Sequence, residues 1–328
     1  MLQKVVQKNQ LLKFYLSSSI TLSLLSIFYF LLYFLGISPN GTDWEFYSTL
    51  RMIDFSETSL YFQREFISWW LIGQVNIISN GSNYAVPIAI HSSLILSTLL
   101  LTANHKGNYG NLIILLIPLF FSNFYILMSV NGLRQGIGLI FFLLFLFFAQ
   151  HRNFSLAIVF LGLSIFSHNS FILFAPIIFF FTSIPSYLIK GGIIVIFLAL
   201  FFFQELALTI ADRAVGKISP NNFSMLFIAI MLFFFVVTLQ INKYLHKVKS
   251  TYIYLLFYLL VIPLPFYSDN SLFERICYTS IPIMYIYVMR EISKIKVDIL
   301  TIGIFTVSTT AVSIYFFTNS SIQSNFSF

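Results

Sequence analysis

Charged residues and cysteines are both scarce in this 328-residue chain. Only 9% of the residues are charged, whereas 58% are hydrophobic and 19% are aromatic. This balance excludes a soluble globular protein of this size, because too little polar surface exists to cover it. The single cysteine, Cys277, excludes an internal disulfide framework and leaves the redox compartment undetermined. Lipid is therefore expected to be the solvent for much of the chain.

The familiar motifs of soluble enzymes are missing as well. The sequence contains no phosphate-binding glycine loop, no dinucleotide-binding fingerprint, no HExxH and no CxxC. We therefore expect no metal site and no cofactor. The formal net charge of +7 would suit a nucleic-acid partner, but lysines on the cytoplasmic face of a membrane protein give the same charge. No nucleic-acid partner is expected.

Long apolar runs recur along the whole chain. A spanning helix needs about 20 apolar residues, because the hydrocarbon core is about 30 Å thick and tolerates no unpaired backbone group. The sequence predicts an all-α, polytopic membrane bundle of about eleven transmembrane helices, forming a single domain over residues 1–328. The runs lie at 15–36, 85–103, 111–129, 135–150, 154–168, 170–186, 191–206, 223–240, 251–267, 276–290 and 298–317. A re-entrant pair or a broken helix is the alternative at the short run 154–168 and at the tight turn 129–135.

The charges sort by side when the N-terminus is placed in the cytoplasm and the runs alternate. The first run lacks a small-residue cleavage site, so it is interpreted as a retained anchor. Twelve of the 18 basic residues then lie inside and nine of the 11 acidic residues lie outside, as the positive-inside rule requires. The C-terminus is predicted to be extracytoplasmic.

Arginine is concentrated on the predicted outer face. Five of the six outer basic residues are arginines, whereas ten of the twelve inner ones are lysines. Because a guanidinium binds phosphate or carboxylate through two parallel hydrogen bonds, this bias predicts that anions are recognised at the outer face of the membrane. The alternative is that these arginines form structural ion pairs with outer carboxylates.

Polar groups at the ends of apolar runs are the candidates for chemistry, because ionisable side chains are costly to bury in a membrane. The first group is Asn131-Gly-Leu-Arg134-Gln135-Gly136. Asn131 and Arg134 share one face if the helix begins early, and the glycines permit close approach of backbone or ligand. The alternative is an outer turn whose arginine extends to the interface.

Two further groups lie at predicted outer ends. Ser167-His168-Asn169-Ser170 ends the fifth run, and Arg275 and Tyr278 begin the tenth. Neutral histidine accepts a proton and its charged form binds an anion, whereas a structural histidine would only hydrogen-bond the turn. Because successive spans cross the membrane in alternating directions, Arg134, His168 and Arg275 are predicted to lie at one membrane face. There they would suit a diphosphate-bearing lipid.

Residues 37–84 form the longest polar stretch, and we expect it to be an extracytoplasmic interfacial loop. It mixes charges with aromatic residues, a composition that favours helices lying at the membrane interface. Its candidate side chains include carboxylates, arginines and a tyrosine without a recognisable catalytic spacing. They are Asp43, Tyr47, Arg51, Arg64 and Glu65.

Together these motifs resemble the EpsG-like, Wzy-type polysaccharide polymerases. The resemblance rests on the group from Asn131 to Gly136 and on His168-Asn-Ser about 30 residues later. Asp43-x-x-x-Tyr47 and Arg275 followed by Tyr278 also fit, so the resemblance covers most of the chain. Members of the family often carry a Gln-Asn pair where this chain has Val130-Asn131, and this departure leaves the role of the preceding amide open.

The resemblance implies a metal-independent glycosyltransferase of the bacterial inner membrane with an extracytoplasmic active face. Its substrate would be an undecaprenyl-diphosphate-linked oligosaccharide, whose growing glycan passes to a new lipid-linked repeat unit to lengthen O-antigen, capsule or exopolysaccharide. The expected catalytic residues are His168, Arg134 and Arg275. The arginines would bind the diphosphate, and His168 would act as a base or as a phosphate ligand, with Asp43 or Glu65 as rival bases. The expected substrate-binding residues are Asn131, Gln135, Asn169, Tyr278, Asp43, Tyr47, Arg51, Arg64 and Glu65.

Three other functions fit parts of the sequence. An O-antigen-type ligase would differ only in its acceptor. A flippase or other transporter of lipid-linked oligosaccharide would carry charges at mid-depth and internal repeats, neither of which is evident. A sugar acyltransferase would place its histidine near the acyl-CoA side. The sequence leaves open the sugars, the linkage, the oligomeric state and whether a flippase or a chain-length regulator acts as a partner.

Overall fold

The computed structural model is helical throughout the part of the chain that it describes. These described residues are 2–36, 38–39, 65–103, 108–130, 132–182, 186–202, 223–245, 248, 250–267, 270–295 and 326–327. They belong to two compact units. The first unit comprises Met1–Phe148, Asn153–Asn169 and Ser293–Phe328, and the second comprises Ala149–Arg152 and Ser170–Ile292. Each unit is described by itself.

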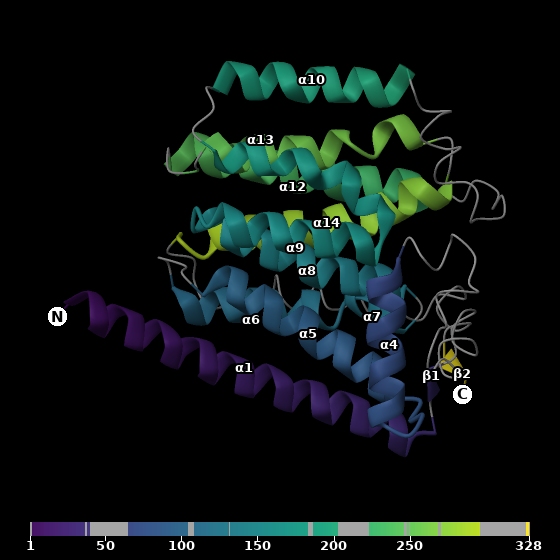
Figure 1. The fold of residues 1–328 in the computed structure, drawn as a ribbon. Helices are drawn as coiled ribbons and strands as arrows, with labels where there is room; N and C mark the ends of the chain where they lie inside the picture. Colours follow the sequence, from purple (N-terminus) through teal and green to yellow (C-terminus); the bar gives the residue numbers. More distant parts are fainter. Residues whose placement is uncertain are drawn as a thin grey trace. The chain divides into compact units, whose positions relative to one another are not determined.

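The first unit contains seven helices in its described part. They are α1 (Leu2–Phe34), α4 (Phe66–Ile78), α5 (Ala85–Thr102), α6 (Tyr109–Phe120), α7 (Asn123–Val130), α8 (Leu133–Gln150, of which Ala149 and Gln150 belong to the second unit) and α9 (Phe154–Ser167). Helix α5 packs against α1, α4 and α7, and α4 also packs against α9. Most of these helices run lengthwise beside one another (Figure 1). The apolar runs of the sequence thus become a bundle whose core is built from leucine, isoleucine and phenylalanine.

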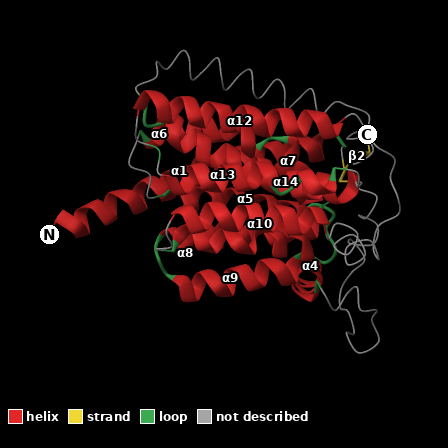
Figure 2. Cartoon of the chain, turned by 90° about the horizontal axis from the view of Figure 1, so that it is seen from above, coloured by secondary structure: helices red, strands yellow, loops and turns green. Residues whose placement is uncertain are grey.

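Helix α4 runs crosswise to α5, α8 and α9 (Figure 1). Both views place it at one end of these helices (Figures 1 and 2). Its buried face includes Ser68, Trp69 and Asn76, whereas Trp70 and Ile78 are exposed. Ile72 is buried on the same face, and the large apolar side chains exposed on the outer face suit contact with lipid. Ser68 ties this helix to the end of α9, because its hydroxyl donates to the Ser167 carbonyl over 2.9 Å.

The predicted span at 111–129 is a broken helix. Helices α6 and α7 meet at an angle of 53° at residues 121–122. The break leaves the Phe120 carbonyl outside a continuous α-helical ladder, and Nε2 of His91 lies 2.6 Å from it. Nδ1 of His91 lies 3.2 Å from the Tyr29 hydroxyl. A neutral His91 that donates from Nε2 and accepts at Nδ1 satisfies both contacts, so this buried ring ties α1 and α5 to the break.

The C-terminal segment of the first unit makes short pairings with earlier parts of that unit. Strand β1 (Ser38–Pro39) pairs with β2 (Phe326–Ser327), and these two-residue strands are the only ones in the described residues. The Asn108 N–H, just before α6, donates to the Ser293 carbonyl over 3.3 Å. The predicted span 298–317 lies outside the described residues. The segments that flank it lie beside the end of α1 and the start of α6.

The second unit is a smaller helical bundle. Its elements are η1 (Asn169–Phe181, of which Asn169 belongs to the first unit), α10 (Ser186–Phe202), α12 (Phe223–Leu245), α13 (Ser250–Val261), η3 (Leu264–Phe266) and α14 (Asn270–Ile292). Helix α12 packs against α13 and α14, and α10 packs against α13 and η3. Tyr278 of α14 makes an edge-to-face contact with Phe227 of α12, with ring centroids 5.4 Å apart.

Segment η1 is a 3₁₀ helix of 13 residues, which is long for this conformation. At about 2.0 Å per residue it extends about 26 Å, whereas an α-helix of equal length would extend about 20 Å. In the 3₁₀ pattern the Leu173 carbonyl would accept from residue 176, but Pro176 has no N–H. The Tyr258 hydroxyl of α13 donates to that carbonyl instead, over 2.5 Å. A short apolar segment is thereby stretched nearly to membrane thickness.

The all-α class of the prediction is confirmed for the described residues, apart from β1 and β2. Among the described residues, three helical segments are long and apolar enough to cross a membrane, namely Leu12–Phe34, Ala85–Thr102 and Leu133–Gln150. The α6–α7 pair counts as a fourth if it forms one bent span. The number of eleven spans and the sidedness of the termini stay predictions.

Candidate active site

The Glu65 carboxylate lies at the centre of a buried polar cluster in the first unit. It receives a hydrogen bond and an ion pair from Nη1 of Arg134 at its Oε2 atom. Its Oε1 atom lies 2.7 Å from Nδ1 of His168 and accepts from the Asn169 N–H over 3.1 Å. Three donors from two other segments of the chain therefore meet one carboxylate.

Glu65 is positioned by the start of the crosswise helix α4. It is the N-cap residue of α4, yet its side chain makes no capping hydrogen bond to that helix. Instead the side chain reaches the ends of α8 and α9. This departure from ordinary capping indicates that the carboxylate is held for its contacts with Arg134 and His168, since an N-cap carboxylate usually bonds its own helix.

His168 is positioned by the end of α9. The helix ends at Ser167, and His168 adopts an extended backbone while its N–H still bonds the Ser164 carbonyl over 3.0 Å. The Ser164 hydroxyl in turn donates to the Gly138 carbonyl of α8 over 2.8 Å. The extended residue turns the imidazole out of the helical path and toward Glu65, and the contact to Gly138 fixes α9 against α8.

Arg134 is positioned by the first turn of α8. A Cβ atom on Gly136 would meet the Met128 carbonyl oxygen of α7 at 2.5 Å and Cγ2 of Ile90 at 3.0 Å, so only glycine fits there. Gly136 thus permits the close approach that the sequence predicted, and the group that approaches it is the backbone of α7. The Arg134 guanidinium lies 4.8 Å from the ring centroid of Trp69, in a cation–π contact that orients it toward Glu65.

The cluster is largely removed from solvent. The side chains of Arg134, His168 and Glu65 are 11%, 8% and 5% exposed. Burial alone would raise the pKa of Glu65, but the charge and hydrogen bond of His168, the Arg134 guanidinium and the Asn169 N–H outweigh burial and lower the pKa to about 2. Glu65 is therefore ionised throughout the physiological pH range.

The ionised carboxylate decides which nitrogen of His168 carries a proton. A carboxylate only accepts hydrogen bonds, so Nδ1 must be protonated to bond Glu65. In the neutral ring the lone pair then lies on Nε2. The arrangement matches the general pattern in which a carboxylate orients a histidine side chain.

The remaining predicted site residues are distributed as follows. Gln135 is buried in α8, and Asn169 has an exposed side chain and contributes its backbone N–H to Glu65. Arg275 and Tyr278 belong to α14 of the second unit, so their convergence with Arg134 and His168 stays a prediction. Five predicted residues lie outside the described part of the chain. They are Asp43, Tyr47, Arg51, Arg64 and Asn131.

Two features of the first unit escaped the sequence analysis. The first is His91, the one ionisable residue within the apolar run 85–103, which was a visible signal. The second is Trp69, whose contact with Arg134 joins residues far apart in sequence. No group of three or more His, Cys, Asp and Glu residues is arranged to hold a metal ion in the residues that the structure describes.

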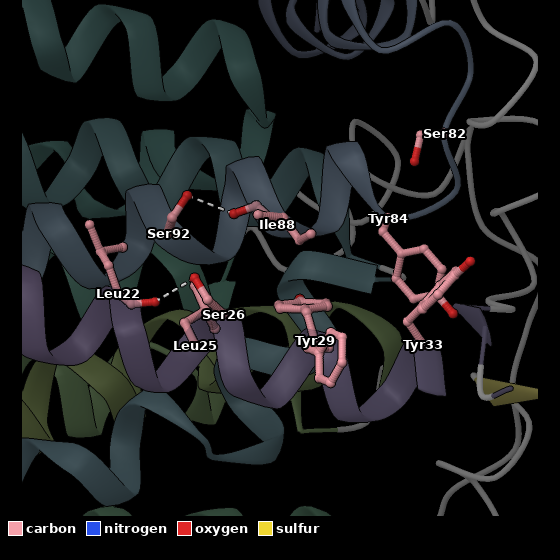
Figure 3. Close-up of a pocket in the computed structure, with 10 residues that line it drawn as sticks. Leu22, Leu25, Ser26, Tyr29, Tyr33, Ser82, Tyr84, Ile88 and Ser92 are labelled. Carbon is pink, nitrogen blue, oxygen red and sulfur yellow. Dashed lines mark hydrogen bonds between the residues drawn. The ribbon is translucent and has the colours of Figure 1, made fainter. Parts of the chain in front are cut away.

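A groove of about 560 Å³ lies along α1 and α5 (Figure 3). Its lining includes none of the residues of the Glu65 cluster. Tyr29, Tyr33, Tyr84 and Ile88 are among its lining residues. The hydroxyls of Ser26 and Ser92, which also line it, donate to carbonyls of their own helices, at Leu22 over 2.9 Å and at Ile88 over 2.6 Å (Figure 3). No charged side chain lines this groove, so the candidate chemistry remains at Glu65, Arg134 and His168.

Comparison with known proteins bears on nearly the whole chain. The model of the EpsG family matches residues 21–328, a range that includes Glu65, Arg134 and His168. No curated protein and no solved structure matches the chain. The match confirms the resemblance inferred from the motifs around Arg134, His168 and Arg275.

Proposed function

Because the chain belongs to the EpsG family and carries helices able to cross a membrane, it is a membrane protein of polysaccharide biosynthesis, and we propose that it is a polysaccharide polymerase. In this proposal it transfers a growing glycan from undecaprenyl diphosphate to a new lipid-linked oligosaccharide repeat unit. The reaction takes place on the extracytoplasmic face of the bacterial inner membrane. The contact of Glu65 with both Arg134 and His168 is the observation that supports it most strongly.

The proposed reaction is a substitution at the anomeric carbon of the donor glycan. A hydroxyl oxygen of the acceptor sugar forms a bond to that carbon, while the bond from the carbon to the diphosphate oxygen breaks. The leaving diphosphate takes the bonding electron pair, and the hydroxyl proton passes to Nε2 of His168. No metal ion is needed for this balance, provided that cationic side chains offset the charge on the diphosphate.

Arg134 is the proposed ligand of the diphosphate. Its guanidinium presents several N–H donors in a fixed plane, so it can bind two phosphate oxygens at once. Trp69 packs against the guanidinium face and limits its movement. Arg275 is proposed as a second phosphate ligand from α14. Gln135, Asn169, Tyr278 and the outer residues Asp43, Tyr47, Arg51, Arg64 and Asn131 are proposed to contact the sugars or the phosphates.

His168 is the proposed general base, with Glu65 as the residue that orients it. A carboxylate with a pKa of about 2 accepts a proton poorly at neutral pH, which argues against Glu65 as the base. Its contact with Nδ1 instead leaves Nε2 to take the proton. The charge of Glu65 also stabilises the imidazolium that forms during transfer.

The test is reconstitution of the purified protein in proteoliposomes with one defined lipid-linked repeat unit. Mass spectrometry of the products should show a series of glycans that differ by one repeat unit and remain attached to lipid. Transfer of glycan to an acceptor that is not lipid-linked would indicate a ligase instead. Movement of substrate across the bilayer without polymer would indicate a flippase, and either result would overturn the proposal.

A further inference from the structure

The donors around Glu65 form an anion-binding site that the chain fills with its own carboxylate. They are a guanidinium N–H, an imidazole N–H and a backbone N–H, from Arg134, His168 and Asn169. Glu65 itself is only 4% exposed. Such a set of donors is equally suited to phosphate oxygens, because carboxylate and phosphate accept hydrogen bonds from the same groups.

The carboxylate divides its two oxygens between different partners. Oε2 faces Arg134, whereas Oε1 faces both His168 and Asn169. Loss of the Arg134 contact would thus leave Glu65 with two donors, and the buried carboxylate would not become unpaired. The guanidinium would also stay in place, because it packs on Trp69 independently of Glu65. The contact between Arg134 and Glu65 can therefore break without dismantling the rest of the cluster.

We propose that Glu65 is an internal stand-in for a substrate phosphate and that the lipid diphosphate takes its place on Arg134. This inference rests on the proposed function, since it assigns a diphosphate to the Arg134 site. In the exchange, Nη1 of Arg134 passes from Oε2 of Glu65 to a phosphate oxygen, and Oε1 of Glu65 stays on His168. No covalent bond changes.

The exchange links substrate binding to the state of the histidine. Before substrate binds, the charge of Glu65 is shared between Arg134 and His168. After the exchange, Glu65 serves His168 and Asn169 alone, so its charge is free to stabilise the imidazolium that proton transfer creates. Glu65 therefore lowers the affinity for diphosphate and makes His168 a stronger base. Because the same carboxylate does both, diphosphate binding and proton transfer are coupled.

The Glu65→Gln variant separates these effects. Its amide oxygen can still accept from His168 and Asn169, while its amide nitrogen, a donor, cannot hold Arg134. Removal of the competing carboxylate should tighten binding of inorganic pyrophosphate to the full-length protein in nanodiscs by about 10-fold or more, measured by isothermal titration calorimetry. With lipid-linked substrate, KM should fall and kcat should fall as well, because a neutral amide stabilises the imidazolium less.

Two controls make the measurement specific. Glu291→Gln removes the same charge at the end of α14 opposite Arg275 and Tyr278, and it should leave pyrophosphate affinity within about 2-fold of that of the unaltered protein. In the double variant Glu65→Gln/Arg134→Gln the gain in affinity should disappear, because Arg134 is the group that Glu65 competes for. If Glu65→Gln does not fold, Glu65→Asp replaces it, since the shorter side chain retracts the charge and should tighten binding to a smaller extent.

The outcomes distinguish this inference from the proposed function. Tighter pyrophosphate binding by Glu65→Gln, lost in the double variant, supports the stand-in role. Equal or weaker binding by Glu65→Gln, while the unaltered protein polymerises and binds pyrophosphate, overturns the stand-in role alone. Failure of the unaltered protein both to polymerise and to bind pyrophosphate overturns the proposed function.

Discussion

Nδ1 of His168 lies 2.7 Å from Oε1 of Glu65, although 103 residues separate them in the chain. The contact joins the end of α9 to the start of the crosswise helix α4, and it fixes which imidazole nitrogen carries a proton. Because Arg134 binds the other oxygen of the same carboxylate, one residue orders both proposed catalytic groups.

Replacing His168 by asparagine should abolish most polymer formation. A positioned base commonly contributes about 100-fold or more to a rate, and asparagine cannot take the acceptor proton. The matched control is His151→Asn at the exposed turn after α8, which should polymerise normally. Initial rates with defined lipid-linked substrate, measured on folded protein, give the comparison. Equal rates for both variants would mean that His168 is not the base.

Stability should depend on pH through Glu65. Its pKa is lowered from the ordinary value of 4.5 to about 2 in the folded protein, so its ionised form stabilises the fold above about pH 4.5. That contribution should disappear as pH falls from about 4.5 to about 2, and it amounts to about 3 kcal/mol at most. The difference in thermal midpoint between the unaltered protein and Glu65→Gln should therefore shrink over this range. A difference that stays constant would contradict the assignment.

Gly136→Ala should destabilise the protein and impair polymerisation together. The added methyl would lie 2.5 Å from the Met128 carbonyl, so α8 would have to move away from α7 and take Arg134 with it. Overpacking of this kind costs about 1–3 kcal/mol. Gly162→Ala in α9 is the control, because nothing lies within 4 Å of its added methyl. Thermal midpoints and product lengths should separate the two variants, and an active, stable Gly136→Ala would disprove the packing argument.

Tyr258→Phe should weaken the second unit by about 1–3 kcal/mol, because the Leu173 carbonyl loses the hydroxyl that donates to it. The control is Tyr267→Phe, which alters an exposed tyrosine. Hydrogen exchange of amides in η1 and thermal unfolding would both report the change. Unaltered exchange in η1 would show that the hydroxyl does not support the 3₁₀ segment.

The sequence was sufficient to predict a helical membrane protein of this family and to select Arg134 and His168. Both follow from local pattern, because apolar runs end at isolated polar groups. It also named Glu65, but only as a rival base. Its actual contacts depend on how α4 crosses α8 and α9, and tertiary packing of that kind has no local signature.

The type of helix within each apolar run, and the breaks in it, could not be predicted from the sequence either. Hydrophobicity alone does not distinguish a 3₁₀ helix from an α-helix, so η1 was expected only as an apolar span. The break between α6 and α7 was not expected at residues 121–122 either. It becomes understandable once His91 is seen at the Phe120 carbonyl, a contact that again joins distant parts of the chain.

If Arg134 binds a lipid diphosphate through its guanidinium, Arg134→Lys should prevent polymer formation. Lysine keeps the charge and loses the planar set of donors, whereas Arg152→Lys makes the same change at the exposed turn after α8. Both variants would be expressed in a strain that lacks its own polymerase, and glycan length would be examined on gels. We expect single repeat units or very short chains for Arg134→Lys and a normal ladder for Arg152→Lys. A normal ladder from folded Arg134→Lys protein would contradict it.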